Sequence, residues 1–335
     1  MHVSTIKLTF SVEDILAYLQ PGMDQVSALI GGALRSDIPL LDSTNRSLWD
    51  HPGKMMRPML TLLVAGAAGT PSEDTYRFAA ATELLHNATL LHDDVVDGAT
   101  ERRGLPTIAS YLGGSAAVLI GDFWLEKCLQ MILGSRRETE RVLRLFAQTV
   151  GHLTEGELLQ MQKATSADTT QADYQRIIYG KTASLFESAA MSAAISVGTS
   201  ETVVRAMGDF ALKLGLAFQI KDDIFDYDED AADIGKPVGI DLKEQKITQP
   251  LLCALERVSA DEQRRIRSLV AGIADNPSLA AEVAAFVKAQ DGVSLAVAEM
   301  DYHMNSAISC LEILPDTLEK TYLIKLAHYI VERNR

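Results

Sequence analysis

The sequence predicts an all-α protein. Alanine and leucine dominate the composition, aromatic residues make up only 6% of the chain, and alternating runs of β-branched residues are scarce. Alanine and leucine favour helices, whereas strands favour β-branched and aromatic side chains. With 335 residues, 47% of them hydrophobic, the chain can build a sizeable core, either as one large domain or as two ordinary ones.

Proline, glycine and capping residues divide the chain into its expected helices. Helices are expected from about Ser11 to Pro21, from there through Leu34, from Pro58 onward, from Ser72 to Asp97, and over 115–133, 138–164, 173–197 and 200–226. Loops are expected at 35–50, 98–106 and 166–170. From about Pro250 the chain should be helical, with breaks near Ser259, Pro277, Gly292 and Pro315.

Charge and cysteine content limit the class of partner. A formal net charge of −14 argues against nucleic acid, which requires a basic surface. An anionic substrate is compatible with it, because bound cations and local lysines and arginines set the field inside a site. Cys128, Cys253 and Cys310 are isolated, which predicts core residues in a reducing compartment. No signal-peptide pattern or bilayer-length apolar run is present, so we expect a cytoplasmic protein without a transmembrane segment.

The central feature of the sequence is an apolar run, 83–92, that leads into three carboxylates. Asp93 and Asp97 stand four residues apart and lie on one face of a helix, with Asp94 beside them. His86 continues the same stripe seven residues earlier. Carboxylates seldom enter an apolar helical face unless a cation meets them, because an unpaired buried charge is costly.

A second apolar run, 214–221, leads into the same Asp-Asp-x-x-Asp pattern at Asp222, Asp223 and Asp226. A single copy usually belongs to a solvated helix end or a calcium-type loop, but two copies in apolar helices are far more specific. Carboxylate oxygens suit Mg²⁺, which proteins commonly bind through one or two carboxylates together with substrate phosphates. If the two motifs face each other, they predict a magnesium-bridged diphosphate site.

Two basic segments are candidate phosphate ligands, one at a helix start and one just after the first acidic motif. Lys54 and Arg57 are three residues apart before the helix at Pro58, which fits a phosphate cradle, although a solvated helix start is the plainer interpretation. Arg102 and Arg103 follow the first acidic motif. They are either ion partners of the acids or phosphate ligands, and the acids nearby favour the second role.

Two segments of the second half also carry chemistry. Gly180-Lys181-Thr182 places a glycine, a lysine and a hydroxyl in an apolar helix, where glycine costs about 1 kcal/mol relative to alanine. That cost suggests a kink or a close ligand approach, although a lone lysine on a helix is ordinarily a surface residue. The polar segment 227–249 directly follows the second acidic motif and predicts a mobile flap, with a solvated loop as the alternative.

Over about 53–250, these motifs resemble those of the trans-isoprenyl diphosphate synthases in order and spacing. The matching residues are Gly53-Lys54-x-x-Arg57-Pro58, Asp93-Asp94-x-x-Asp97 with Arg102-Arg103-Gly104, Lys181-Thr182, Gln219-x-x-Asp222-Asp223-x-x-Asp226, and Gly235-Lys236 ahead of Asp241-Leu242. The resemblance implies an isoprenoid synthase-type helical bundle around a deep central cavity, usually a homodimer. It also implies a single domain over 1–335, with an N-terminal lead at 1–20.

The resemblance further implies roles for individual residues. Magnesium would be bound mainly by Asp93, Asp97 and Asp222, supported by Asp94, Asp223 and Asp226. Isopentenyl diphosphate would be bound by Lys54, Arg57, His86 and Arg103, with Gly53 allowing close backbone approach. The allylic diphosphate would be bound by Arg102, Lys181, Thr182, Gln219, Lys236 and Lys246.

The implied reaction is an ionisation, condensation and elimination. Magnesium and basic residues neutralise the leaving diphosphate, the allylic carbon–oxygen bond ionises, and the alkene of isopentenyl diphosphate attacks. Oxygens of Thr182 and Gln219 would stabilise the cation, and the released diphosphate would remove the proton. One position departs from the family, which commonly has Glu-Gly-Lys where this chain has Glu244-Gln245-Lys246. The resemblance therefore does not predict that turn or the role of Lys246.

Residues before the first acidic motif set an expectation for product length. A chain growing toward the helix N-terminus passes one turn, about 5.4 Å, per prenyl unit. The first floor would be Thr89 and Ala88, with Leu85 and Thr82 below, whereas short-chain members usually carry an aromatic residue there. We therefore predict a heptaprenyl to decaprenyl product, octaprenyl-like. The alternative is that Ala88 only packs against a neighbour and Trp124 forms the floor, which would give a geranylgeranyl-length product. The alternative function is therefore a short-chain farnesyl or geranylgeranyl diphosphate synthase.

Three other functions fit parts of the pattern. A class I terpene cyclase has an acid-rich metal site but would not need Lys54, Arg57 and His86. A catalytically silent partner subunit tends to lose one acidic motif, and both are intact here. A di-iron carboxylate bundle needs two Glu-x-x-His pairs and two further glutamates, whereas we find only one such pair in an apolar setting, Glu83 with His86.

Overall fold

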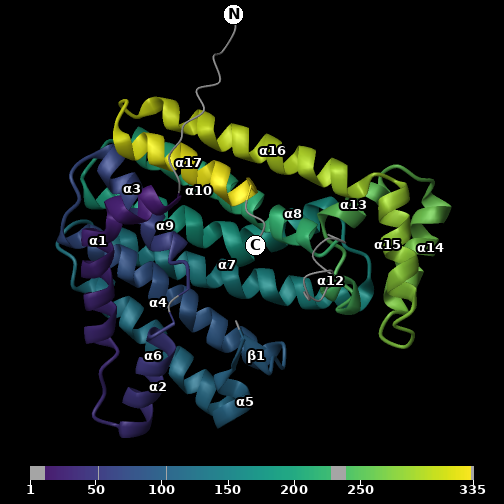
Figure 1. Cartoon of the computed structure of the whole chain (residues 1–335), viewed down its shortest axis with the longest axis horizontal. Helices are drawn as coiled ribbons and strands as arrows, with labels where there is room; N and C mark the ends of the chain where they lie inside the picture. The colour runs from purple at the N-terminus through teal and green to yellow at the C-terminus, as the bar shows by residue number, and fades with distance from the viewer. Residues whose placement is uncertain (1–11, 52, 103, 228–238, 333–335) are drawn as a thin grey trace, which may run out of the picture. The chain divides into compact units, whose positions relative to one another are not determined.

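A computed structural model describes residues 12–51, 53–102, 104–227 and 239–332, and Figure 1 shows the chain. The described residues confirm the all-α prediction, because their only strands are β1 (Glu101–Arg102) and β2 (Leu105–Pro106). The two strands form an antiparallel pair in which Arg102 lies opposite Leu105. Residues 1–11 of the predicted N-terminal lead and residues 228–238 of the predicted flap lie outside the described residues.

The helices account for nearly all of the remaining structure. In chain order they are α1 (Val12–Ala33), α2 (Pro39–Trp49), α3 (Met56–Ala68), α4 (Glu73–Val96), α5 (Ile108–Leu112), α6 (Gly114–Leu133), α7 (Thr139–Ser166), α8 (Gln171–Ile178), the π-helix η1 (Tyr179–Ala183), α9 (Ser184–Ser196), α10 (Glu201–Phe225), α12 (Ile240–Lys243), α13 (Gln249–Leu255), α14 (Ala260–Ala271), α15 (Leu279–Ala289), α16 (Gly292–Cys310), the 3₁₀-helix η2 (Leu311–Ile313) and α17 (Leu318–Glu332). None of the helices in this described part is long and apolar enough to cross a membrane.

Two predictions for the N-terminal region were wrong. The chain does not form two helices around Pro21, because α1 continues through it. Burial of Val26 and Ile30 offsets the loss of one backbone hydrogen bond at the proline, which costs about 3 kcal/mol in a helix interior. The expected loop at 35–50 contains α2, which begins at Pro39 and is tied by the buried Asn45, whose side-chain amide donates to the carbonyl of Leu34 (2.8 Å).

The chain forms two compact units. The first comprises Met1–Leu143, Ala189–Val204 and Leu314–Tyr329, and the second comprises Arg144–Ser188, Arg205–Ile313 and Ile330–Arg335. The first acidic motif belongs to the first unit and the second motif to the second unit.

In the first unit, α4 is the central helix. It packs against α6, α3, α1 and α5, and its buried residues include Phe78, Leu84 and Leu85. Ser72 and Thr75 form a capping box at its start, as the sequence predicts for a helix beginning there. The helix ends at Val96 with Asp97 as its C-cap, so this packing fixes the position of all three aspartates.

The core of the second unit joins α10, α13, α14, α15 and α16. Leu251, Val270, Val283 and Ala296 are fully buried in it. Helix α13 packs against α16, α15 and α8, and α14 packs against α15. This core fixes the C-terminal half of α10, which carries the second acidic motif.

Candidate active site

The three aspartates of the first motif have different environments at the end of α4. Asp93 is half-buried, Asp94 is 4% exposed, and Asp97 is exposed. The backbone N–H of Asp97 donates to the carbonyl of Asp93 (2.8 Å) and that of Ala99 to the carbonyl of Asp94 (3.0 Å), which closes the helix end. The motif therefore runs from the interior to the surface within one helical turn.

Asp94 is paired with Arg102 of the β1–β2 hairpin. Arg102 Nε donates to Asp94 Oδ1 at 2.8 Å, and this ion pair satisfies a carboxylate that would otherwise be costly to bury. The contact corresponds to the ion-partner interpretation of Arg102. A role in phosphate binding stays a prediction, and Arg103 lies outside the described residues.

Lys54 and Arg57, two of the basic residues predicted to bind substrate, lie around the start of α3. Gly53 and Met55 both have left-handed backbones, with φ of 73° and 46°, so the chain turns sharply on either side of the exposed Lys54. Lys54 Nζ lies 5.8 Å from the ring centre of Tyr329. Arg57 is half-buried in the first turn of α3. His86, on α4, is also half-buried.

The residues predicted to set product length occupy two environments. Thr82, Leu85 and Ala88 are at most 1% exposed, and Thr89 is half-buried with its hydroxyl donating to the carbonyl of His86 (2.8 Å). Trp124 is buried on α6, where its indole N–H donates to Asn45 Oδ1 (2.9 Å).

Trp124 borders a pocket of about 580 Å³ within the first unit. From α4, this pocket is lined by Asn87, Leu90, Leu91 and Asp94, and by none of the four predicted floor residues on that helix.

The second motif lies at the end of α10. Asp222 is half-buried, whereas Asp223 is 4% exposed and accepts hydrogen bonds from Tyr174 Oη (2.5 Å) and Gln219 Nε2 (3.0 Å). Both carboxylate oxygens of Asp226 accept backbone N–H groups at the start of α12, from Ile240 (2.8 Å) and Asp241 (3.0 Å). Asp223 is therefore held by side chains and Asp226 by backbone.

Lys181 and Thr182 lie on the π-helix η1 between α8 and α9. The helix is irregular at Gly180, where it forms this π-helix. The glycine makes room for a neighbouring helix, because a Cβ there would lie 2.5 Å from the carbonyl oxygen of His152 on α7. A Cβ at Gly215 of α10 would likewise lie 2.6 Å from the Cα of Ala183. Gly180 and Gly215 thus let α7 and α10 approach η1 closely. Short π-helical segments such as η1 often occur at functional sites.

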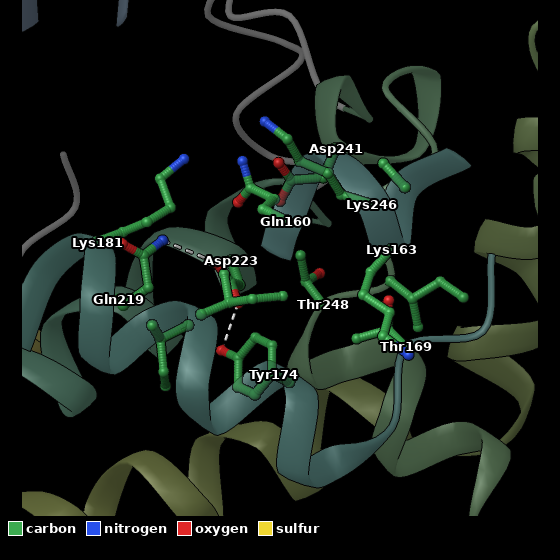
Figure 2. A pocket seen from close by; sticks show the side chains of 14 residues that line it. Gln160, Lys163, Thr169, Tyr174, Lys181, Gln219, Asp223, Asp241, Lys246 and Thr248 are labelled. Atoms are coloured by element: carbon green, nitrogen blue, oxygen red, sulfur yellow. Dashed lines mark hydrogen bonds between the residues drawn. The ribbon is translucent and has the colours of Figure 1, made fainter. Parts of the chain in front are cut away.

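Figure 2 shows Lys181, Gln219, Asp223 and Tyr174 around one pocket of the second unit. The hydroxyl of Thr182 donates to Gln219 Oε1 (2.7 Å). The amide of Gln219 donates in turn to Asp223, and Figure 2 marks this bond with a dashed line. Lys181 Nζ forms an ion pair with Glu157 (2.6 Å). A pocket of about 140 Å³ is lined by Lys181, Gln219, Asp223, Lys246, Tyr174, Asp241, Gln160, Lys163, Thr248 and neighbouring residues.

Burial changes the proton affinity of the acids in this pocket. It raises the pKa of Asp223 and of Asp241, and the carboxylate of Asp223 further raises that of Asp241. Burial also raises the pKa of Tyr174, so its hydroxyl keeps its proton and remains a donor to Asp223. The pocket therefore combines lysines with carboxylates that are costly to ionise without a cation.

The sequence alone did not indicate roles for several residues that line this pocket or contact its lining. Tyr174 is 49 residues from Asp223 in the chain, and Glu157 is also distant from Lys181. No local sequence pattern therefore connects either residue with its partner. Asp241 belongs to the family motif Gly235-Lys236 ahead of Asp241-Leu242, but the resemblance implies no role for it. The proposed ligand Lys236 lies outside the described residues.

The residue types of the two motifs fit a hard divalent cation. Asp93, Asp97 and Asp222 offer only carboxylate oxygens, the donors that Mg²⁺ prefers. Neither Asp-Asp-x-x-Asp segment contains a cysteine, methionine or histidine. Within the part of the chain that the structure describes, no group of three or more His, Cys, Asp and Glu side chains is arranged to bind a metal.

Comparison with known proteins gives one consistent result. Residues 38–289 match the family model described as Polyprenyl synthetase. The chain is 35% identical over 324 residues to the octaprenyl diphosphate synthase of Haemophilus influenzae, covering 97% of this chain and 98% of that protein.

Two solved structures are similar over the same length. A decaprenyl diphosphate synthase from Rhodobacter capsulatus has a TM-score of 0.89 and 32% identity, covering 97% of this chain and all of that one. A polyprenyl synthase from Caulobacter crescentus, solved with calcium and isoprenyl diphosphate, has a TM-score of 0.88 and 30% identity, covering 97% and 98%. Sequence, fold and motifs agree, and the chain therefore belongs to the polyprenyl synthetase family of prenyltransferases.

Proposed function

We propose that this chain condenses isopentenyl diphosphate with an allylic diphosphate and repeats the step to make a long all-trans polyprenyl diphosphate. The observation that carries the proposal is the pocket beside the second acidic motif, which Lys181, Lys246 and Gln219 line although the chain is strongly acidic overall. Lysines and amide donors bind phosphate oxygens, and adjacent carboxylates suit a bridging cation.

Metal binding is assigned to Asp93 and Asp97 in the first unit and to Asp222 in the second, with Asp94, Asp223 and Asp226 in supporting roles. Bound Mg²⁺ would neutralise negative charge on the diphosphate. The buried Asp94 is bound by Arg102, and the buried Asp223 is bound by Tyr174 and Gln219. These two acids would therefore support the metal ligands and not bind the metal directly.

The allylic diphosphate is assigned to Lys181, Lys246 and Arg102, together with Lys236. These cations compensate the charge that develops on the leaving oxygen as its bond to carbon breaks. A diphosphate at Lys181 would compete with Glu157, its present ion partner.

Thr182 and Gln219 are assigned to the allylic cation. Because Asp223 accepts from Gln219 Nε2, the amide oxygen is held toward Thr182. The two oxygens form a fixed pair of dipoles, and a fixed pair stabilises a cation without the cost of reorganisation.

Isopentenyl diphosphate is assigned to Lys54, Arg57, His86 and Arg103, with Gly53 permitting close backbone approach. Holding its alkene beside the cation replaces an encounter in solution with an oriented attack. The released diphosphate removes the proton, so no side-chain nucleophile is required.

A long product is supported by the sizes of the residues before the first motif. Thr82, Leu85, Ala88 and Thr89 include no aromatic side chain that could block a growing chain. Trp124, the alternative floor, is instead tied to Asn45 beside a pocket that these four residues do not line. The names of the octaprenyl and decaprenyl relatives agree with this length.

Assembly as a homodimer and a cytoplasmic location complete the proposal. Tyr111 on α5 and Leu119 and Leu133 on α6 are 79%, 68% and 60% exposed, an apolar set that a second copy would cover. Cys128, Cys253 and Cys310 are free thiols, in agreement with a reducing compartment.

The proposal is tested by incubating the purified chain with farnesyl diphosphate, labelled isopentenyl diphosphate and Mg²⁺, and measuring product length by mass spectrometry. We expect products of seven to ten prenyl units and no product with EDTA. A product that stops at four units would reject the long-chain assignment. Hydrocarbon release without isopentenyl diphosphate would indicate a cyclase instead.

A further inference from the structure

The turn after α12 ends that helix with two characteristic hydrogen bonds. Lys246 N–H donates to the carbonyl of Asp241 (2.8 Å), and Gln245 N–H donates to the carbonyl of Leu242 (3.0 Å). This is the hydrogen-bond pattern of a Schellman motif, in which the residue after the C-cap must adopt a left-handed conformation. Gln245 occupies that position, with a φ of 58°.

A left-handed glutamine is unusual here, because glycine normally fills this position of the motif. The family also commonly has glycine at this point, in Glu-Gly-Lys, and this chain departs from that pattern. A side chain at a left-handed position is disfavoured unless another contact compensates for it. The structure shows such a contact.

The side chain of Gln245 is bound to the end of another helix. Its Nε2 donates to the carbonyls of Ala271 (2.7 Å) and Val270 (3.3 Å) in the last turn of α14. Carbonyls in a last helical turn lack partners within their own helix, and the negative end of the helix dipole favours a donor there. The amide thus supplies a tertiary contact that glycine could not make.

The next residue is the lysine of the anion pocket. Lys246 lines the pocket with Lys181, Gln219 and Asp223. Behind it, Ile247 is 3% exposed and packs in the core of the second unit. The backbone of Lys246 is therefore held between a buried residue on one side and the Gln245 anchor on the other.

We propose that Gln245 is a positioning residue that replaces the usual glycine and fixes Lys246 in the allylic diphosphate pocket by anchoring the turn to α14. The inference rests on the proposed role of Lys246. It ties the turn at Lys246 to the last turn of α14, a contact that a glycine turn would lack.

Three substitutions separate the anchor from the backbone strain. Gln245→Ala removes the amide and keeps the left-handed side chain, whereas Gln245→Gly removes the amide and the strain together. Gln245→Glu keeps the shape but turns a carboxylate toward two carbonyls. We expect the KM for farnesyl diphosphate to rise about tenfold in Gln245→Ala and at least as much in Gln245→Glu, with a several-fold rise persisting in Gln245→Gly.

The KM for isopentenyl diphosphate should stay within about twofold of wild type in all three variants, because its proposed ligands lie elsewhere. The matched control is Gln263→Ala. Gln263 lies at the start of α14, where its Nε2 donates to the carbonyls of Leu255 (3.0 Å) and Val258 (3.3 Å) near the end of α13. Its loss removes a similar contact at the opposite end of α14 and leaves the contact of Gln245 with the last turn in place. The control should leave the KM for farnesyl diphosphate unchanged.

Hydrogen exchange provides a readout that does not depend on activity. The amide of Lys246 should exchange faster in Gln245→Ala and Gln245→Gly than in wild type, and unchanged exchange in both would overturn the positioning role. A wild-type KM for farnesyl diphosphate in all three variants would also overturn it. If Lys246→Ala itself leaves that KM unchanged while exchange in the Gln245 variants is faster, the assignment of Lys246 fails and the anchor stands.

Discussion

The two acidic motifs have the same spacing, but they are supported in different ways. In the first, the buried Asp94 pairs with Arg102, eight residues later in the chain. In the second, the buried Asp223 is bound by Gln219, four residues earlier, and by Tyr174, 49 residues away on α8. The first motif is stabilised by a neighbouring hairpin and the second by tertiary packing.

This difference shows what an Asp-Asp-x-x-Asp pattern specifies. The pattern sets which carboxylates share a helix face. It does not specify how each acid is satisfied, since Asp226 caps α12 whereas Asp97 is an exposed C-cap. Equal spacing therefore predicts equal chemistry for the first acid of each motif, Asp93 and Asp222, which we call the outer acids. It predicts unequal effects on stability for the second acid of each motif, Asp94 and Asp223, which we call the inner acids.

The largest expected effect concerns the outer acids, for which the two motifs should behave alike. Asp93→Ala and Asp222→Ala should each lower kcat roughly a thousandfold or more, because each removes a proposed ligand of the metal that neutralises the leaving group. Steady-state kinetics at saturating Mg²⁺ measures this. Asp275→Ala, an exposed acid outside both motifs, is the control, and a loss of less than tenfold in either motif variant would contradict the metal assignment.

The inner acids should distinguish the motifs by stability. Asp223→Ala should lower the free energy of unfolding by about 2–4 kcal/mol, because it leaves the buried Tyr174 hydroxyl and the Gln219 amide without their acceptor. Asp94→Ala should cost about 1–2 kcal/mol, because the partly exposed Arg102 can turn to water. Urea unfolding compares the two, and Tyr174→Phe should reproduce part of the Asp223 effect. Equal losses of unfolding free energy in Asp223→Ala and Asp94→Ala would contradict the view that the partners of the two acids determine the effect.

A pH series should sharpen the same contrast. Burial raises the pKa of Asp241, beside the second motif, to about 8 from an unfolded value near 3.8. A group with a raised folded pKa contributes stability below its unfolded pKa and loses it as the pH rises through the folded value. Without metal, wild type should therefore lose stability between about pH 4 and pH 8. Asp241→Asn should flatten that slope, and an identical slope in the variant would exclude Asp241 as its source.

The third acids, Asp97 and Asp226, should have the smallest effects on the free energy of unfolding. Asp226→Ala should cost about 1 kcal/mol and speed exchange of the Ile240 and Asp241 amides, because it removes the cap of α12. Asp97→Ala should change stability by less than about 0.5 kcal/mol, because its side chain is exposed. Urea unfolding with hydrogen exchange measures both, and a larger loss for Asp97 would reverse the comparison.

Prediction from the sequence succeeded where the signal was local. The capped start of α4, its end near Asp97, and the later breaks near Ser259 and Gly292 depend on neighbouring residues, and the structure has them. It failed at Pro21 and at 35–50, because burial of α1 and the Asn45–Trp124 contact come from residues far away in the chain.

The same contrast between local signals and distant contacts applies to the candidate site. The sequence alone determined the all-helical class, the family motifs and the acids at two helix ends, since helical periodicity and residue chemistry are properties of adjacent positions. Only the tertiary structure decided that Tyr174 holds Asp223, that Glu157 meets Lys181 and that Gln245 is anchored on α14. Those contacts form between segments distant in the chain, and the packing that brings such segments together leaves no local pattern to read.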